Sequence, residues 1–571
     1  MAYIRAVTDL AAPPPSLPSA SLLPLRNRQT AAWLAFAALV ALVIAAPILA
    51  ILINLGQPAP DVWQHLISTV LPEMLRNTVL MMVGVGLGAM VIGTGCAWLV
   101  TMTEFPGRRL LSWALFLPLA MPAYVSAFVY SDLLQFAGPV QTALRQAFDW
   151  QRGDYWFPDF MSLNGAIALF ILGFYPYVFM LARAAFLDQS VCVLEVGRTL
   201  GLGPWTRFWR IALPLARPMI AGGVALVLME TLADFGAVSW LGVPTFTTAI
   251  YRTWFGMGDV TAAAQLAAAL LIFVLAAVML ERASRQAKRF HHTSARTRPL
   301  PLRPLPPLQA ALAILACCLP ILLGFLLPAG WLFHLAWMEG DGFSFGRLAG
   351  FTFNSFILAG VSAVLLIVVA LGLAYMHRIA NNRAANWLIR LATMGYAVPG
   401  SVIAIGVLLP LAAFDHAVDH WAKTLFGISP GLLLSGTVAA LLYAYLVRFL
   451  AVAFNAVDGG LHRIRPSLDQ AARVLGETPL GVVRRVHAPL LRGSLLTAAL
   501  LIFVDVLKEL PATMIVRPFD FDTLAVRVYQ LASDERLAEA STGSLIIVAV
   551  SLIPVIWLHR VVARSRPGDS P

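Results

Sequence analysis

Charged residues and cysteines are scarce in this sequence. Only 12% of its 571 residues are charged and 59% are hydrophobic, whereas soluble domains are typically about 25% charged. A soluble fold this apolar would expose large apolar patches and aggregate, so the composition excludes that class. The cysteines show no metal-site spacing, and we interpret them as small buried hydrophobes. They are Cys96, Cys192, Cys317 and Cys318.

Motifs for ATP binding and for metal-dependent hydrolysis are also lacking. No GxxxxGK[ST] loop occurs, so the chain does not bind ATP by that route. HExxH is absent and the ten histidines are scattered. This leaves no catalytic constellation, and a membrane-embedded enzyme is the least favoured hypothesis. The net charge of +11 does not indicate nucleic-acid binding, because in a membrane protein such an excess usually marks cytoplasmic loops.

Long apolar runs dominate the chain. Runs of about 18 or more nearly uncharged residues predict membrane-spanning helices, and solid apolar blocks argue against a transmembrane barrel. We therefore predict an all-α polytopic membrane protein with about twelve spans. The runs lie near 31–54, 77–102, 109–136, 163–186, 219–241, 262–281, 309–336, 352–376, 387–413, 430–456, 493–516 and 541–559.

Basic residues predict the orientation of these spans. They gather after every second run, in groups that begin at Arg108, Arg183, Arg282 and Arg448. Lys and Arg favour cytoplasmic loops, so these loops and both termini are predicted to be cytoplasmic.

The same pattern divides the chain into two halves and a linker. The linker is basic and then Pro-rich ("RPLPLRPLPP"), as expected of a cytoplasmic connection. The predicted parts are a disordered cytoplasmic tail (1–30), a first half (31–281), the linker (282–308), a second half (309–562) and a cytoplasmic tail (563–571).

One stretch of sequence occurs twice. "VLEVGRTLGLGPWTRFWRIALP" (193–214) returns as "LDQAARVLGETPLGVVRRVHAP" (468–489). Repetition in both halves predicts two tandem copies of one six-span unit with the same orientation. The offset is 275 residues for Gly201 and Gly476, Pro214 and Pro489, Glu230 and Asp505, and Asp234 and Glu509; upstream it is 277, as for Pro122 and Pro399.

Each copy of this stretch predicts a protruding cytoplasmic element. A first helix ends near Gly201 or Gly476, where a positive φ angle is easily adopted. A short second helix follows, with basic residues on one side and apolar residues on the other. It is too short and too charged to span a bilayer. One such element in each half would suit a two-fold partner.

The first copy resembles the cytoplasmic loop signature of permeases from ATP-binding-cassette (ABC) importers. The resemblance rests on Glu195, Gly201, Ile211, Leu213 and Pro214. It implies that each loop inserts into one of two ATPase subunits, which would hold ATP and Mg²⁺, so that this chain needs no cofactor. The second copy departs from the signature, with glutamine and alanine in place of the glutamate and leucine. The implied coupling residues are Glu195, Gly201, Arg207, Ile211, Pro214, Gln470, Gly476, Arg484, Val486 and Pro489.

The segments after the loops, "ETLADFGAVSWLGVPTFTTAIYRTWFGMGD" (230–259) and "DVLKELPATMIVRPFDFDTLAVRVYQLASDE" (505–535), are similar to ferric-iron-type permeases. That resemblance implies a bacterial inner-membrane importer that receives Fe³⁺ from a periplasmic binding protein and binds no metal tightly. An importer for thiamine, a phosphonate or a polyamine is the first alternative. A secondary transporter driven by an ion gradient is the second.

Ionisable residues near the ends of apolar spans are candidates for a translocation path or gate. Such groups are costly in a membrane and usually line a polar path or pair internally. Carboxylates would meet a hard cation. The alternative is a structural pair in which Lys508 neutralises Asp505 or Glu509. Prolines in two spans predict kinks beside the path. The candidates are Glu230, Asp234, Asp505, Lys508, Glu509, Pro122 and Pro399.

Polar residues in the predicted outer loops are candidates for docking the binding protein. The alternative for the threonines and aspartates is helix capping. These residues are Thr248, Arg252, Asp259, Thr523, Arg527 and Asp534. On the cytoplasmic side, Arg198, Arg484 and Arg485 are further candidates for contact with anionic lipid headgroups.

Overall fold

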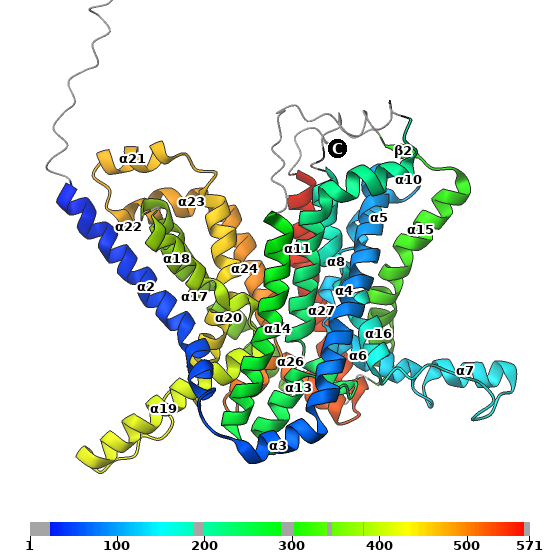
Figure 1. The fold of residues 1–571 in the computed structure, drawn as a ribbon, viewed down its shortest axis with the longest axis horizontal. Helices are drawn as coiled ribbons and strands as arrows, with labels where there is room; N and C mark the ends of the chain where they lie inside the picture. The colour runs from blue at the N-terminus through cyan, green and yellow to red at the C-terminus, as the bar shows by residue number, and fades with distance from the viewer. Residues whose placement is uncertain are drawn as a thin grey trace, which may run out of the picture.

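The computed structural model is a helical bundle whose long helices run side by side (Figure 1). It describes residues 23–187, 189, 199, 201–286, 302–339, 345–380 and 382–564. Ten described helices are long and apolar enough to cross a membrane, and two bent helix pairs raise the number to twelve if each pair is one span. The predicted all-α polytopic fold is confirmed.

The first half begins with a helix that starts at Leu23, before the predicted boundary at residue 31. Helix formers such as leucine, arginine and glutamine precede the apolar run, so the helix continues beyond it. The elements are α2 (Leu23–Asn54), α3 (Pro60–Thr69), α4 (Leu71–Met102), β1 (Thr103–Glu104), α5 (Arg108–Ala114), η3 (Leu117–Ala120), α6 (Ala123–Leu134), α7 (Pro139–Phe148), α8 (Leu163–Leu187), α10 (Pro204–Arg207), η4 (Phe208–Ala212), α11 (Leu213–Ala233), α12 (Gly236–Trp240), α13 (Phe246–Tyr251), η5 (Arg252–Gly256) and α14 (Val260–Gln286).

The second half repeats this order. Its ninth predicted span, 387–413, is corrected: an amphipathic helix occupies 383–392 and the apolar helix runs from Gly400 to Phe426. The elements are β2 (Arg303–Pro304), α15 (Pro307–Ile321), η6 (Leu322–Leu326), α16 (Leu327–Glu339), α17 (Phe345–Ala380), α18 (Arg383–Ala392), η8 (Met394–Ala397), α19 (Gly400–Phe426), α20 (Val438–Leu461), α21 (Pro466–Val474), α22 (Pro479–Val482), η9 (Val483–His487), α23 (Ala488–Leu490), α24 (Arg492–Leu507), α25 (Pro511–Val516), α26 (Leu524–Ser533) and α27 (Leu537–Arg564).

Three long helices form the core of each half. Helix α4 packs against α8 and α11, and α17 packs against α20 and α24 in the equivalent positions. Glycines allow the close approach in the first half. A Cβ atom on Gly93 or Gly223 would lie only 2.8 Å from atoms of the α8 backbone. Small residues commonly permit such contact between membrane helices.

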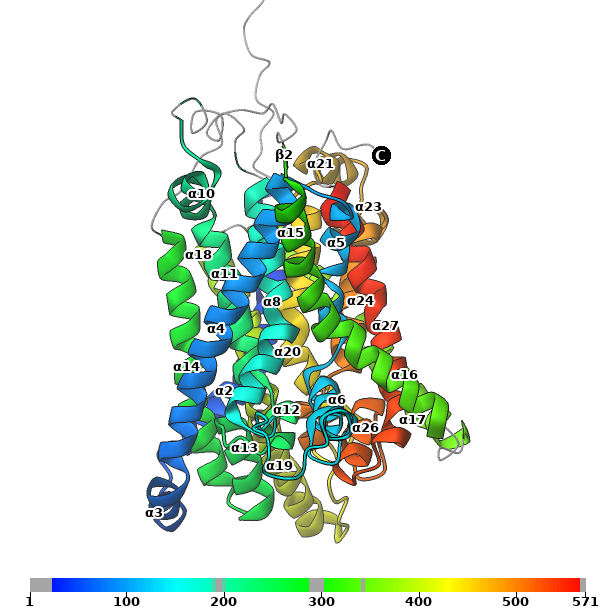
Figure 2. The ribbon, with the colours of Figure 1, turned by 90° about the vertical axis from the view of Figure 1, so that its right-hand side faces the viewer.

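The first span of each half packs on the other half. Helix α2 contacts α17, α18 and α19, and Tyr443 of α20 donates a hydrogen bond to the Val43 carbonyl at 2.6 Å. Helices α15 and α16 contact α4, α5, α6 and α27, and Figure 2 shows them crossing the face of the bundle. Trp331 of α16 donates to Asp132 of α6 at 2.7 Å. The exchange ties the halves together, so 31–281 is not a self-contained unit in space.

The end of the linker is fastened to the first half. Strand β2 pairs in parallel with β1, with Thr103 opposite Arg303, and the Leu305 amide donates to the Glu104 carbonyl at 3.1 Å. This pairing places the start of α15 beside the end of α4. Residues 287–301 of the predicted linker lie outside the described residues.

Two spans are broken where the sequence predicted only proline kinks. Pro122 and Pro399 precede α6 and α19 as their N-cap residues, and the residues before them are extended. Proline disfavours a helical conformation in the preceding residue, which explains a full break. The segments on either side of the first break differ in direction by 91°.

The exchanged packing can be tested with native cysteines. Cys96 of α4 donates to the Ala316 carbonyl of α15 at 3.6 Å and lies within hydrogen-bond reach of the Cys317 thiol. In a Cys192→Ser/Cys318→Ser background with a protease site inserted in the linker, mild oxidation should join the two cleaved halves on a non-reducing gel. Loss of the band with Cys317→Ser is the control. Halves that always separate would contradict the contact.

Candidate functional site

The two repeated loops lie at one end of the molecule. Figures 1 and 2 place α10 and α21–α23 at the same end as the start of α2 and the end of α27. Glu195 and Arg198 lie outside the described residues. The described parts of both loops can be compared directly.

Each loop turns at its glycine. Gly201 has φ +73° and Gly476 has φ +87°, with open space around both, as the sequence predicted for a left-handed turn. Pro204–Arg207 and Pro479–Val482 then form one helical turn, followed by π-helical turns at Phe208–Ala212 and Val483–His487. Ile211 and Val486 occupy equal places in these π turns. Pro214 and Pro489 follow, and both are exposed.

Large apolar side chains are exposed on both loops. Trp205 and Trp209 of the first loop are 69% and 54% exposed. Val474, Leu475 and Leu480 of the second are 87%, 85% and 66% exposed. Exposed apolar groups beside basic residues are typical of a protein-binding surface. Arg484 is exposed nearby, and Arg485 pairs with Glu477 at 2.6 Å.

The second loop is anchored by a polar network that the sequence did not reveal. Asp469 accepts from Arg378 of α17 at 2.6 Å and lies 2.7 Å from the His487 ring. Arg378 also donates to the Leu461 and Ile464 carbonyls. Gln470, at the glutamate position of the signature, is exposed. Asp469 beside it therefore supplies the anchoring carboxylate.

Charged side chains meet at the centre of the molecule, where the halves adjoin. We call Glu230, Asp234, Arg448, Asp505, Lys508 and Glu509 the central charged cluster. Arg448 of α20 pairs with Glu509 at 2.8 Å, and the Glu509 side chain is 1% exposed. Lys508 pairs with Asp505 at 3.1 Å, and each side chain is 28% exposed. Lys508 thus neutralises Asp505, whereas arginine neutralises Glu509.

Two of these carboxylates cap helices. Asp234 accepts from the Ala237 and Val238 amides, at 2.9 and 3.3 Å. Glu509 accepts from the Ala512 and Thr513 amides, at 2.9 and 2.8 Å. Carboxylates at helix N-termini satisfy backbone donors and match the helix dipole. The first turns of α12 and α25 therefore depend on the two repeat-related acids.

The remaining carboxylate, Glu230, faces its neighbours at longer range. It lies close enough to Arg448, Lys508 and Asp505 for electrostatic interaction. No ion pair within 4 Å is formed by Glu230 in the part of the chain that the structure describes. Nor do three His, Cys, Asp or Glu side chains group there as a metal site requires.

The broken helices converge on this cluster. A Cβ atom on Gly400, just after Pro399, would clash with the Arg448 guanidinium and approach Glu509 to 2.9 Å. A Cβ atom on Gly236 would lie 2.8 Å from Tyr124, just after Pro122, and 2.7 Å from Leu510 of the other half. The structure therefore brings the predicted prolines and acids together.

Two arginines assigned to cytoplasmic loops lie inside helices instead. Arg183 is within α8 and Arg448 is within α20. Both positions fall inside apolar runs, 163–186 and 430–456, so a charge at membrane depth was visible in the sequence. Such a charge usually has a buried partner. For Arg448 that partner is Glu509.

Most of the predicted docking residues have structural roles. Thr248 and Thr523 are 3% and 4% exposed. Thr523 caps α26, and Thr248 completes the capping box of α13 with its N-cap residue Thr245, so neither presents a surface to a partner. Asp259 accepts from the Ala262 amide at 2.8 Å. Arg527 lies over the Phe351 ring. Two residues of the set remain exposed, Arg252 and Asp534.

The molecule has two helical halves, each with its first span packed on the other half, two protruding loops and a central charged cluster. These features define a polytopic transport permease. The chain resembles the binding-protein-dependent permeases of ABC importers: residues 89–285 match the family described as "binding-protein-dependent transport system inner membrane component". It is a membrane transport subunit, not an enzyme.

Relatives extend this similarity along the chain. The Fe(3+)-transport system permease protein FbpB 2 of Haemophilus influenzae is 28% identical over 86% of this chain and 90% of its own length. The ferric transport system permease protein FbpB of Actinobacillus pleuropneumoniae is 23% identical over 86% of this chain and 72% of its own. The molybdenum transport system permease protein ModB of Escherichia coli is 33% identical over 25% of this chain and 58% of its own.

The central ion pair generates a stability prediction. Arg448→Met should destabilise the protein by about 3–5 kcal/mol, because Glu509 would keep a buried charge without its partner. The Arg448→Met/Glu509→Gln double variant should recover part of this loss. Thermal denaturation in detergent measures both, with exposed Arg463→Met as the matched control. Equal midpoints for all variants would show that the pair contributes nothing.

Proposed function

We propose that this permease carries ferric iron, delivered by a periplasmic binding protein and driven by two ATPase subunits. The pair of loops, each with a glycine turn and exposed apolar side chains, is the observation that supports transport driven by two ATPase subunits. Their repetition supports one ATPase subunit beneath each half. ATP and Mg²⁺ would be held by those subunits.

The end of the molecule that bears the loops would then face the cytoplasm. The start of α2 and the end of α27 lie at this end (Figure 1), in agreement with the basic loops of the sequence. The other end would receive the binding protein in the periplasm of a bacterium. Exposed Arg252 and Asp534 are the surviving candidates for that contact.

The central charged cluster suits transit of a hard cation. Its four carboxylates and two basic groups sum formally to −2, which attracts a cation that prefers oxygen ligands. Arg448 and Lys508 already engage Glu509 and Asp505. The cluster therefore lacks the converging free carboxylates that would trap the ion. Glu230 and Asp505 are the candidates that meet it directly.

Alternating access would begin at the loops. Closure of the ATPases would move each loop, and the second loop would transmit the movement to α17 through Arg378 and Asp469. Helix α17 packs against α24, which contains Asp505 and ends at Leu507, just before Lys508. Movement at one end can thereby change the central cluster.

Reconstitution tests the cargo. Proteoliposomes containing the chain, its co-encoded ATPase and the binding protein should accumulate ferric iron and hydrolyse ATP faster when the binding protein is loaded with Fe³⁺. Equal stimulation by the empty binding protein, or stimulation by thiamine, 2-aminoethylphosphonate or a polyamine instead, would overturn iron as the cargo. Import driven by a proton gradient without the ATPase would overturn the driving mechanism.

Glycine substitutions test the loops. Gly201→Val and Gly476→Val should each lower import at least tenfold while the chain remains in the membrane, because a β-branched residue is strained at positive φ. ATP hydrolysis should lose its dependence on the loaded binding protein. Gly203→Ala, a neighbour without a positive φ, is the matched control. Normal import by the Gly201→Val/Gly476→Val variant would refute coupling through these turns.

A further inference from the structure

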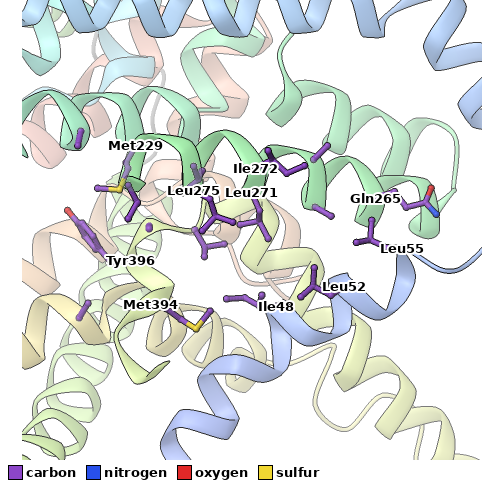
Figure 3. A pocket seen from close by; sticks show the side chains of 18 of the residues that line it. Ile48, Leu52, Leu55, Met229, Gln265, Leu271, Ile272, Leu275, Met394 and Tyr396 are labelled. Carbon is purple, nitrogen blue, oxygen red and sulfur yellow. The ribbon is translucent and has the colours of Figure 1, made fainter. Parts of the chain in front are cut away.

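A large cavity opens between the two halves, and one part of its lining adjoins the central charged cluster. Its volume is about 1380 Å³. Its walls come from α2, α3, α11, α14, α18, η8 and α20, as Figure 3 shows for part of the lining. Small-molecule sites usually occupy about 300–1,000 Å³, so this cavity suits a longer ligand.

The lining of the cavity is apolar along most of its length. Ile48, Leu271 and Leu275 from α2 and α14 face one another across it (Figure 3). Gln265, towards one end, already bonds Trp63 and the Gln57 carbonyl. No Asp or Glu is among the residues that line the cavity. A hard cation would find no oxygen anion here, so the cavity is not its path.

The mouth of the cavity is set among membrane-spanning helices. Leu52, Ile272 and Leu275 line it and are 47%, 67% and 54% exposed. They belong to α2 and α14, two of the helices able to cross a membrane. Exposed apolar side chains at such positions face lipid hydrocarbon. A hydrocarbon chain can therefore enter from the side.

A single basic residue lines the cavity. Arg390 of α18 is exposed and lies over the Trp387 ring at 5.5 Å. It forms no ion pair with any carboxylate among the described residues. Helix α18 follows the end of α17 that carries Arg378, close to the second loop (Figure 1). Arg390 lies in the last turn of α18, four residues before Met394 of the cavity lining, so a headgroup phosphate at that end of the cavity would meet its guanidinium.

We propose that this cavity binds an anionic phospholipid, with its phosphate at Arg390 and an acyl chain between α2 and α14. Arg presents paired donors that match phosphate oxygens. The acyl chain would extend from the end of the cavity marked by Met229 and Tyr396 towards Leu55 and Gln265 (Figure 3). Tyr396 lies within electrostatic range of Glu230 and Asp505. The lipid therefore closes the side of the permease next to the charged cluster and keeps water from reaching that cluster laterally.

Native mass spectrometry of the purified chain tests the site with two probes, dioleoyl-phosphatidylglycerol and dioleoyl-phosphatidylethanolamine. Arg390→Gln should weaken binding of the anionic lipid about fivefold and leave the zwitterionic lipid unchanged. Leu275→Gln, at an exposed wall position, should weaken both. Arg390→Lys should retain most of the preference for phosphatidylglycerol.

Two matched controls make the result decisive. Arg383 is exposed on the same helix and Met279 on the same α14, and neither lines the cavity. Arg383→Gln and Met279→Gln should bind both lipids as the wild type does. Unchanged binding in Arg390→Gln and Leu275→Gln would overturn the site. An equal loss in Arg383→Gln would show general surface charge instead, and would also overturn it.

Discussion

Helix breaks inside a membrane protein must satisfy the backbone groups that they release, and this requirement organises the centre of the permease. In hydrocarbon an unpaired amide costs several kcal/mol, so irregular backbone persists only where protein or water satisfies it. Asp234 and Glu509 do so by accepting hydrogen bonds from the first turns of α12 and α25. The acids are themselves costly to bury, which explains why Arg448 pairs with Glu509. One structural requirement thus accounts for the conjunction of breaks, acids and arginine.

The exchanged first spans make the two halves one mechanical unit. Helix α2 lies on the second half and α15–α16 on the first, so neither half can move without carrying a helix that belongs to the other part of the chain. The β1–β2 pairing fixes where the second exchange begins. In the proposed mechanism, movement of the loops would therefore have to carry these outer helices along with the cores.

The sequence predicted the elements whose physical signals are local, and it missed those that depend on packing between distant segments. Apolar runs predicted the spans, and glycines predicted the left-handed turns that Gly201 and Gly476 adopt. The repeat predicted that Asp234 and Glu509 have equivalent surroundings, because an internal offset compares two copies without knowing their contacts. The packing of each first span on the other half leaves no periodic signal in the sequence, because an apolar helix can pack on either half. Because every arginine is treated as a sign of a cytoplasmic loop, the sequence prediction places Arg448 in a loop. Its position within an apolar run nevertheless indicates a charge with a buried partner.

The two halves share a fold but contribute different charges to the central charged cluster. Both basic members of the central cluster, Arg448 and Lys508, come from the second half, whereas the first half contributes Glu230 and Asp234 and no cation. Glu230 therefore finds its compensating charges across the boundary between the halves. Two unit charges about 4 Å apart attract by about 4 kcal/mol at an effective dielectric constant of 20, and less at longer range. Separating the halves would weaken this attraction, and in the proposed function a cation that enters between them would replace it. A duplicated gene can acquire such complementarity because the two halves can diverge on one chain, whereas identical subunits would place the same charges on both sides.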